Sequence, residues 1–381
     1  MSSIGYNFPG AIYAGWGESM KIAEYVSQLG EGKTFIVTDK GVIDAGIIKK
    51  ITQSLDQAGI PHTVFDGVQP NPTVNNVYEG VAKYREENCN HILAVGGGSP
   101  IDAAKGILVM ARHPGTLRNY YRGEPDYIPI TGDVPPFIAV PTTSGTGSEV
   151  SRGAIITDED NRKRSVGSRH ILPKTVVLDP QLTVTMPPRL TAYTGLDALS
   201  HSVEAITVNI YAPIADAFAR EGLRLVSESL VEAYMDGSEK KPRMDMMNAS
   251  SLGALVFHKG LGVIHSLAHQ LSTRCNMPHG AACGLLIPHA IRFNLKEPGT
   301  HRAYKEVAEI FTGRKAGAED APAAIEGLIQ ALNVPSKLGD WGVTEVDIDV
   351  MAPNAMLDHC HPRNPRKCSE EDMRALYRAA M

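Results

Sequence analysis

The chain has 381 residues, of which 43% are hydrophobic and 21% charged, so its composition is that of an ordinary globular protein and excludes disordered and fibrous classes. Its 37 basic and 42 acidic residues give a net charge of −5 without a conspicuous basic run, so we expect no nucleic acid partner. No stretch reaches the roughly 18 apolar residues of a membrane span, and the segment MSSIGYNFPG lacks the features of a signal peptide. We therefore expect a cytoplasmic protein that does not contact a membrane. Five scattered cysteines without a C-x-x-C pair predict reduced thiols.

Short β-branched runs alternate with helical patterns in the first half of the chain, which is typical of βαβ units on a parallel sheet. Apolar residues at helical spacing from Ile22 to Leu29 predict a helix before the first strand at 33–38. Further strands are expected at 63–65, 91–95, 137–140 and 175–178. Beyond Pro187-Pro188 only long helical stretches follow, at 190–208, 215–235 and 244–257. The pattern predicts an α/β, Rossmann-like dinucleotide-binding domain over 1–184, followed by an all-helical domain over 185–381.

Two loops rich in glycine and hydroxyl groups follow predicted strands. The first, Gly96-Gly97-Gly98-Ser99, opens a helix for which we expect Ser99 to be the N-cap. Free N–H groups at a helix start suit a pyrophosphate, although such loops also occur for packing alone and this one is not a G-x-G-x-x-G motif. The second loop is PTTSGTGSE at 141–149. Because open α/β sheets bind ligands at the carboxyl ends of their strands, the two loops together indicate a nucleotide site.

An acidic residue, Asp39, directly follows the first predicted strand. Its carboxylate can accept hydrogen bonds from both hydroxyls of an adenosine ribose. The same charge would repel a 2′-phosphate, so the sequence favours NAD(H) over NADP(H).

Histidines and an aspartate recur at helical spacing in the second half of the chain. Asp197 and His201 are four residues apart, as are His265 and His269, and His279 follows. A lone histidine in an apolar helix is usually a core residue, but burying several imidazoles without a shared partner would be costly. Oxygen and imidazole ligands without a thiolate suit Fe(II), with Zn(II) as the alternative. The pattern therefore predicts a catalytic metal site.

Four segments together resemble the iron-containing (group III) alcohol dehydrogenase family, including its lactaldehyde reductase and sulfoacetaldehyde reductase members. They are GGGSPID, PTTSGTGSEV, TGLDALSH, and GLGVIHSLAH followed by PHG, and the match runs collinearly from Asp39 to Arg366. The resemblance implies an active site in the cleft between an α/β nucleotide domain and an all-helical metal and catalytic domain. It also implies hydride transfer between NADH and a short-chain aldehyde, and a homodimer.

The resemblance carries over to individual residues of this chain. His269 would lie beside the nicotinamide and join the proton relay. The implied metal ligands are Asp197, His201, His265 and His279. The implied cofactor contacts are Asp39, Asn71, Gly97, Gly98, Ser99, Thr142, Thr143, Lys163 and Leu182.

Some positions depart from the family pattern and add hydrogen-bond donors or positive charge. His258-Lys259 replaces a neutral pair, Arg152-Gly153 follows the second loop, and Cys360 lies in the late segment HCHPR. We predict a short aldehyde with an anionic group, such as a semialdehyde, sulfoacetaldehyde or phosphonoacetaldehyde, held by Arg152, His258 or Lys259. Gly153 would provide room for it.

Alternatives remain open from the sequence. Lys259 could face solvent and Arg152 could pair with Glu149, which would leave a neutral short-chain alcohol or diol as the substrate. A metal-dependent hydrolase could use the same Asp/His cluster, but it gives the glycine loops and Asp39 no role. Polyol dehydrogenases and metal-free dehydroquinate synthases share the two-domain plan, and a non-catalytic nucleotide-binding module is a further alternative.

Overall fold

The computed structural model describes residues 4–381, and the chain divides into two compact units. The sheet unit comprises Asn7–Thr143 and Gly147–Thr185. The helical unit comprises Met186–Met381 together with Ser144–Thr146 and the described residues up to Tyr6. The predicted fold class, an α/β region followed by helices, is confirmed.

Six parallel strands form the sheet, in the order β1-β8-β5-β4-β2-β3. The strands are β1 (Ala11–Ala14), β2 (Thr34–Val37), β3 (His62–Phe65), β4 (His91–Gly96), β5 (Phe137–Pro141) and β8 (Thr175–Leu178). Every residue of β2, β4, β5 and β8 is buried, as expected for a parallel sheet covered on both faces. The edge strand β1 is largely exposed.

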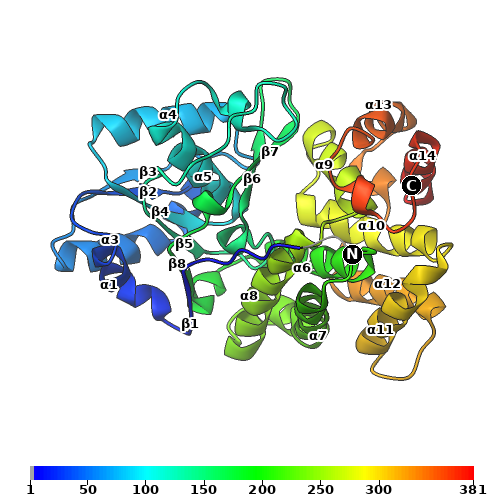
Figure 1. The fold of residues 1–381 in the computed structure, drawn as a ribbon. Coiled ribbons are helices and arrows are strands. Elements are labelled where there is room, and N and C mark those ends of the chain that lie inside the picture. Colours follow the sequence, from blue (N-terminus) through cyan, green and yellow to red (C-terminus); the bar gives the residue numbers. More distant parts are fainter. Residues whose placement is uncertain (1–3) are drawn as a thin grey trace. The chain divides into compact units, whose positions relative to one another are not determined.

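Helices cover both faces of this sheet, so that α1 and α3 lie on the opposite side from α4 and α5 (Figure 1). Alternate side chains of β2 explain this layering, because Phe35 and Val37 join the core with α4 and α5, whereas Ile36 joins the core with α1 and α3. The helices are α1 (Ile22–Ser27), α2 (Lys40–Asp44), α3 (Ile47–Gln57), α4 (Val74–Glu86) and α5 (Gly98–Arg112).

An antiparallel hairpin, β6 (Gly153–Thr157) and β7 (Lys163–Gly167), was not predicted from the sequence. Its strands carry several polar and charged residues, and only alternate residues of β6 are buried. Such short strands give a weak pattern, because their formation depends on packing against α5 rather than on their own apolar residues.

The expectation that Ser99 caps α5 is wrong. The helix begins at Gly98 with Gly97 as its N-cap, and no side chain caps it. A Cβ atom at position 97 would lie 3.1 Å from Oγ1 of Thr143, so the second loop packs tightly against this glycine. The helix therefore starts before the predicted cap, where the two loops lie in close contact.

The helical unit has a single hydrophobic core, to which all its main helices contribute. They are α6 (Pro188–Thr207), α7 (Pro213–Met235), α8 (Lys240–Leu255), α9 (Val263–Arg274), α10 (His279–Asn294), α11 (His301–Thr312), α12 (Ala321–Ala331), α13 (Glu345–Ala355) and α14 (Glu370–Ala379). Helix α6 is buried on nearly all sides and packs against α7, α8 and α10. Within residues 4–381 no helix has the length and apolar character needed to cross a bilayer.

Candidate metal centre

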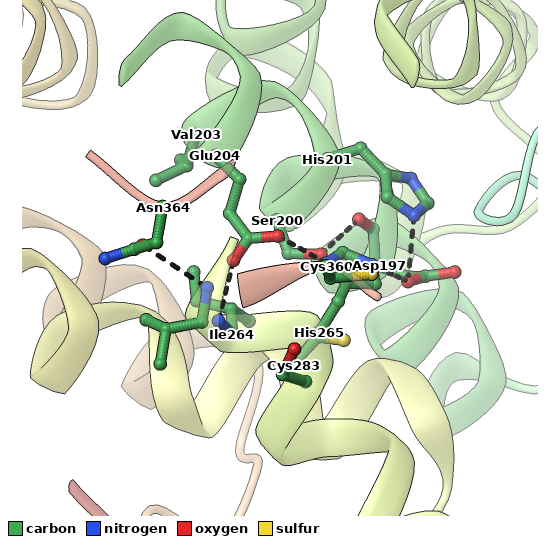
Figure 2. A network of polar contacts seen from close by, with 12 residues as sticks. Asp197, Ser200, His201, Val203, Glu204, Ile264, His265, Cys283, Cys360 and Asn364 are labelled. Carbon is green, nitrogen blue, oxygen red and sulfur yellow. Dashed lines mark hydrogen bonds and ion pairs between the residues drawn. The ribbon is translucent and has the colours of Figure 1, made fainter. Parts of the chain in front are cut away.

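Three imidazoles of the helical unit converge on one carboxylate oxygen. Asp197 and His201 lie one turn apart on α6, His265 is in the first turn of α9, and His279 is the first residue of α10. The Nε2 atoms of His201, His265 and His279 lie 3.6, 3.9 and 3.6 Å from Oδ1 of Asp197. Figure 2 shows His201 and His265 close to Asp197. The structure thus brings the four sequence-predicted ligands together.

The geometry and chemistry of these donors fit a divalent metal ion. Two atoms that each lie about 2.1 Å from one ion can be up to about 4.2 Å apart, so the observed 3.6–3.9 Å is compatible with shared ligation. The Nε2 atom of His265 is buried without a hydrogen-bond partner among the described residues. Its Nδ1 atom donates to Oε2 of Glu204 at 2.6 Å, so Nε2 presents a lone pair to the cluster. A buried lone pair beside other donors is costly unless a cation is shared.

Burial and neighbouring charges tune the two central histidines differently. Burial, and then the charges of His265 and His269, lower the pKa of His201 well below its usual value. His201 is therefore neutral and able to act as a ligand. Burial also opposes charge on His265, but the carboxylates of Glu204, Asp197 and Asp358 together outweigh this effect and raise the pKa of His265. A carboxylate behind an imidazole in this way is the arrangement that commonly orients metal-binding histidines.

A second group of donors lies beside the first. Nδ1 of His269 donates to Oδ2 of Asp358 at 2.7 Å, and the His269 ring stacks on His279 with centroids 5.3 Å apart. Burial would raise the pKa of Asp358, but the charge of His269 and its hydrogen bond lower it well below its usual value. Burial, followed by the charge of Asp358, raises the pKa of Cys360 well above its usual value, so that thiol remains neutral.

Three residues near the cluster were missed from the sequence. Glu204 lies seven residues after Asp197 on α6, and this spacing could have indicated that both face the same way. Cys283 lies one turn after His279 on α10, with its Sγ 3.6 Å from Nε2 of that histidine. One atom each from Asp197, His265, His279 and Cys283 lie within 4.8 Å of one another. Asp358 gave no signal, because its partner His269 is 89 residues away.

The expected cofactor residues gather at the carboxyl edge of the sheet. Asp39 follows β2 and Asn71 follows β3, whereas the two glycine loops follow β4 and β5. These four strands are neighbours in the order β5-β4-β2-β3, so their carboxyl ends meet at one edge. The chain reverses its direction of winding between β2 and β4, which is the position where open α/β sheets bind ligands.

Several of the expected cofactor residues at this edge make contacts within the protein itself. The N–H of Thr142 donates to the carbonyl of Gly96. This hydrogen bond joins the first glycine loop, with Gly97, Gly98 and Ser99, to the second loop, with Thr142 and Thr143. Oδ1 of Asp39 accepts from the N–H of Val42 and so caps α2. Lys163 begins β7, and Leu182 is buried in the core shared with α1 and α3.

The interpretation of Lys259 requires correction. The sequence allows two roles for its side chain, to bind a substrate anion or to face solvent. In the structure it is 3% exposed, and its Nζ lies 2.6 Å from Oδ1 of Asp216. The solvent-facing alternative is therefore wrong, and the Lys259 charge is already balanced by Asp216. His258 is partly buried, and its Nδ1 donates to the carbonyl of Leu255.

Arg152 and Gly153 lie at the start of the hairpin in the sheet unit. Arg152 is partly exposed and forms no ion pair with any described residue, so the alternative that it pairs with Glu149 is wrong. A Cβ atom at Gly153 would have only ordinary contacts, the nearest being Oγ of Ser151 at 3.5 Å. Packing therefore does not demand a glycine at this position.

Comparison with known proteins decides the family. The models described as "Iron-containing alcohol dehydrogenase" and "Fe-containing alcohol dehydrogenase family, C-terminal" match residues 9–180 and 191–381. The chain belongs to the iron-containing alcohol dehydrogenase family. It is therefore an oxidoreductase of alcohols and aldehydes, as the resemblance implied, and the hydrolase and non-catalytic alternatives are excluded.

Individual relatives of this family member cover its whole length. A 4-hydroxybutyrate dehydrogenase from Cupriavidus necator is 38% identical over 97% of this chain and 98% of its own. The crystal structure of a 1,3-propanediol oxidoreductase has a TM-score of 0.94 with 38% identity, and each chain is covered completely. A sulfoacetaldehyde reductase from Bifidobacterium kashiwanohense, solved with NAD⁺, has a TM-score of 0.89 with 27% identity over 100% of this chain and 99% of its own. The expected cofactors, iron and NAD(H), are confirmed by membership of this family and by its relatives.

Proposed function

We propose that this protein is a NAD(H)-dependent, iron-dependent reductase of short aldehydes that carry an anionic group, and that it also catalyses the reverse alcohol oxidation. The observation that carries the proposal is the convergence of three imidazole Nε2 atoms on Oδ1 of Asp197. The carboxyl edge of the sheet supplies the complementary part, a cradle for the dinucleotide.

Each part of the chain has a defined task in this proposal. Asp197, His201, His265 and His279 bind the metal, with Fe(II) expected and Zn(II) as the alternative. When bound, the metal supplies Lewis acidity at the substrate oxygen, and NAD(H) supplies or accepts hydride. His269 exchanges a proton with the alcohol oxygen. Asp358 holds the hydrogen of His269 on Nδ1, which leaves Nε2 as the basic atom of that ring.

In this proposal the dinucleotide binds at the carboxyl edge of the sheet. The N–H groups at the start of α5 can face a pyrophosphate, and Asn71, Lys163 and Leu182 are retained as proposed contacts by family resemblance. For Asp39, one carboxylate oxygen caps α2, so the ribose hydroxyls would share the carboxylate with Val42.

The anionic substrate is supported by charge and by two relatives. Arg152 is a cation of the sheet unit that no described carboxylate neutralises, and the adjacent Gly153 leaves space. The names of two relatives specify substrates with a carboxylate or a sulfonate, 4-hydroxybutyrate and sulfoacetaldehyde. We propose no contact of Lys259 with the anion, because Asp216 balances its charge. Nδ1 of His258 already donates to the carbonyl of Leu255, and the thiol of Cys360 is neutral, so we propose no contact with the anion for these two residues.

A pair of aldehydes of similar size tests the substrate. We expect the iron-loaded protein with NADH to reduce succinate semialdehyde with a higher kcat/KM than butanal. In Arg152→Gln this preference should fall by about 10- to 100-fold, because a hydrogen bond to a charged group contributes about 1.5–3 kcal/mol. Arg162→Gln, an exposed arginine in the turn of the same hairpin, is the matched control. A wild-type preference for butanal would refute the anionic substrate and favour a neutral alcohol or diol.

A homodimer is a further part of the proposal. The edge strand β1 leaves its second side unpaired within the sheet, and Ile12 and Tyr13 on it are exposed apolar residues. Light scattering at micromolar concentration should give twice the 41.0 kDa of the chain. Replacement of Ile12 by lysine should shift the protein towards the monomer.

A further inference from the structure

The buried carboxylate of Glu204 uses both its oxygens on the first turn of another helix. Glu204 lies on α6, where it is 5% exposed. Its Oε1 accepts from the N–H of Ile264, and its Oε2 accepts from Nδ1 of His265, each at 2.6 Å. Figure 2 shows the carboxylate between α6 and the start of α9. Two adjacent residues of α9, one through its backbone and one through its ring, are thus held by one charge.

The start of α9 has no cap of its own, so this contact is not redundant. The N-cap residue is Gly262, which has no side chain. A Cβ atom there would lie 2.8 Å from Oδ1 of Asn364 and 3.0 Å from Oε1 of Glu204. Asn364 accepts from the N–H of Val263 at 3.3 Å. Side chains distant in sequence therefore take the place of the cap, and the glycine is needed to admit them.

The acceptor on Nδ1 also decides which nitrogen of His265 faces the donor cluster with a lone pair. An ionised carboxylate can only accept, so the hydrogen of His265 remains on Nδ1 and Nε2 is available as a ligand atom. With a donor in place of Oε2, the neutral ring would instead carry its hydrogen on Nε2. That hydrogen would point at the position of the metal and block ligation.

We propose that Glu204 is a positioning residue for the metal centre: it caps α9 and fixes His265 in the tautomer that can bind the ion. This inference rests on the proposed metal site. Glu204 lies on the same side of α6 as the proposed ligands Asp197 and His201. Helix α6 would thus supply two ligands and the residue that positions a third. The cap sets the position of His265 along α9, and the hydrogen bond sets the orientation of its ring.

Glu204→Gln separates the tautomer from the cap. The amide oxygen can still accept from the N–H of Ile264, which preserves the cap and the volume of the side chain. The amide NH₂ group then faces Nδ1 of His265 as a donor, which favours the tautomer with hydrogen on Nε2. We expect the metal-free variant to retain the wild-type circular dichroism spectrum. We expect its affinity for Co(II), followed by the visible d–d absorption of the full-length protein, to fall by about 10- to 100-fold.

Two further variants make the result specific. Glu204→Asp keeps an ionised acceptor but leaves the space of one methylene, so it should be less stable than Glu204→Gln and yet bind Co(II) more tightly. A purely structural role would give the opposite order of affinities. Glu232→Gln makes the same chemical change at an exposed position of α7 and should leave Co(II) binding unchanged.

The outcomes distinguish this inference from the proposed function. Wild-type protein that binds no Co(II) would refute the metal site itself. Wild-type protein that binds Co(II) and a folded Glu204→Gln variant that binds it equally well would refute only the role of Glu204. If Glu204→Gln does not fold, Glu204→Asp decides: binding within tenfold of the wild type supports the inference, and loss of binding by the folded variant overturns it.

Discussion

At the scale of the residue, His265 links two carboxylates of the site, those of Asp197 and Glu204. His265→Ala removes one imidazole from the donor set and leaves Glu204 with a buried charge that has lost a partner. We expect loss of bound metal and of dehydrogenase activity together, measured as metal per chain by emission spectrometry and as NADH oxidation with an aldehyde. His301→Ala, at a partly exposed position outside the cluster, is the control. A metal-free variant with full activity would contradict the ligand assignment.

A substitution at Gly280 tests how tightly the proposed ligand His279 is positioned. A Cβ atom there would lie 1.9 Å from the backbone oxygen of Tyr193, so α10 must move away from α6 to accept any side chain. We expect Gly280→Ala to lower the free energy of unfolding by about 1–3 kcal/mol, and to weaken metal binding because His279 is the preceding residue. Denaturant unfolding of the metal-free protein and a Co(II) titration measure the two effects.

The control for this variant is another helical glycine. Gly327 lies within α12 and has nothing within 4 Å of an added Cβ atom. Gly327→Ala should therefore be neutral or stabilising by up to about 1 kcal/mol, since alanine favours the helix. Equal behaviour of the two variants would show that the contact between α10 and α6 adapts without cost.

At the scale of the element, α5 begins at the carboxyl edge of the sheet and also holds the segments that follow β5. Nζ of Lys105 is fully buried and donates to the carbonyls of Ser148, Ser151 and Gly153 at 2.6–2.8 Å. Oδ2 of Asp102 accepts from the N–H of Ile155. One helix therefore holds both the end of the second glycine loop and the start of the β6–β7 hairpin, where Arg152 lies.

The pH dependence of stability should report this lysine. Burial lowers the pKa of Lys105 from 10.5 to about 8. Between these values the unfolded chain binds the proton that the folded chain has released, so folding stability from this group rises with pH and is constant below about pH 8. The free energy of unfolding of the wild type relative to Lys105→Met should thus increase by up to about 3 kcal/mol from pH 8 to 10.5. A difference that decreases over this range would show that the three carbonyls hold the ammonium more strongly than burial opposes it.

The elements that could be predicted from the sequence are those with a strong local pattern. The continuous apolar runs of β2, β4, β5 and β8 and the long helices of the second half needed no tertiary information. The β6–β7 hairpin and the cap of α5 were missed or wrong, because each depends on a neighbour brought close only by folding. The hairpin contacts Lys105 of α5 through the carbonyl of Gly153, and the start of α5 packs against Thr143 of the second loop.

The same distinction holds for the candidate site. The i, i+4 pairs Asp197/His201 and His265/His269, with His279 nearby, indicated a metal site from the sequence alone. The choice of Asp197, His201, His265 and His279 as the proposed ligands came from the family resemblance. Glu204 and Asp358 were missed because each acts through a histidine on another element, 61 and 89 residues away. The surroundings of Lys259 were also misjudged, since Asp216 is 43 residues distant. Partners of this kind are set by helix packing, which periodicity does not report.

At the scale of the whole molecule, the two units have separate hydrophobic cores, with the proposed metal ligands in one unit and all the proposed cofactor residues in the other. We therefore expect the metal ion to stabilise the helical unit and NAD(H) to stabilise the sheet unit. A metal bound only by folded α6, α9 and α10 lowers the population of any state in which these helices open. At a free concentration 100 times Kd the stabilisation is about 2.7 kcal/mol, which corresponds to roughly 100-fold slower opening-dependent exchange.

Hydrogen exchange followed by mass spectrometry can resolve this separation. Addition of Co(II) should slow exchange in peptides from α6, α9 and α10, because Asp197, His201, His265 and His279 come from these helices. NADH added alone should slow exchange in the loops after β2, β4 and β5, where Asp39 and the glycine loops lie. Peptides from α12, which carry no proposed ligand, report any general effect of added metal. If Co(II) slowed exchange in α3 and α4 as strongly as in α9, the stability of the two units would be coupled as one, and separate binding sites would not explain the response.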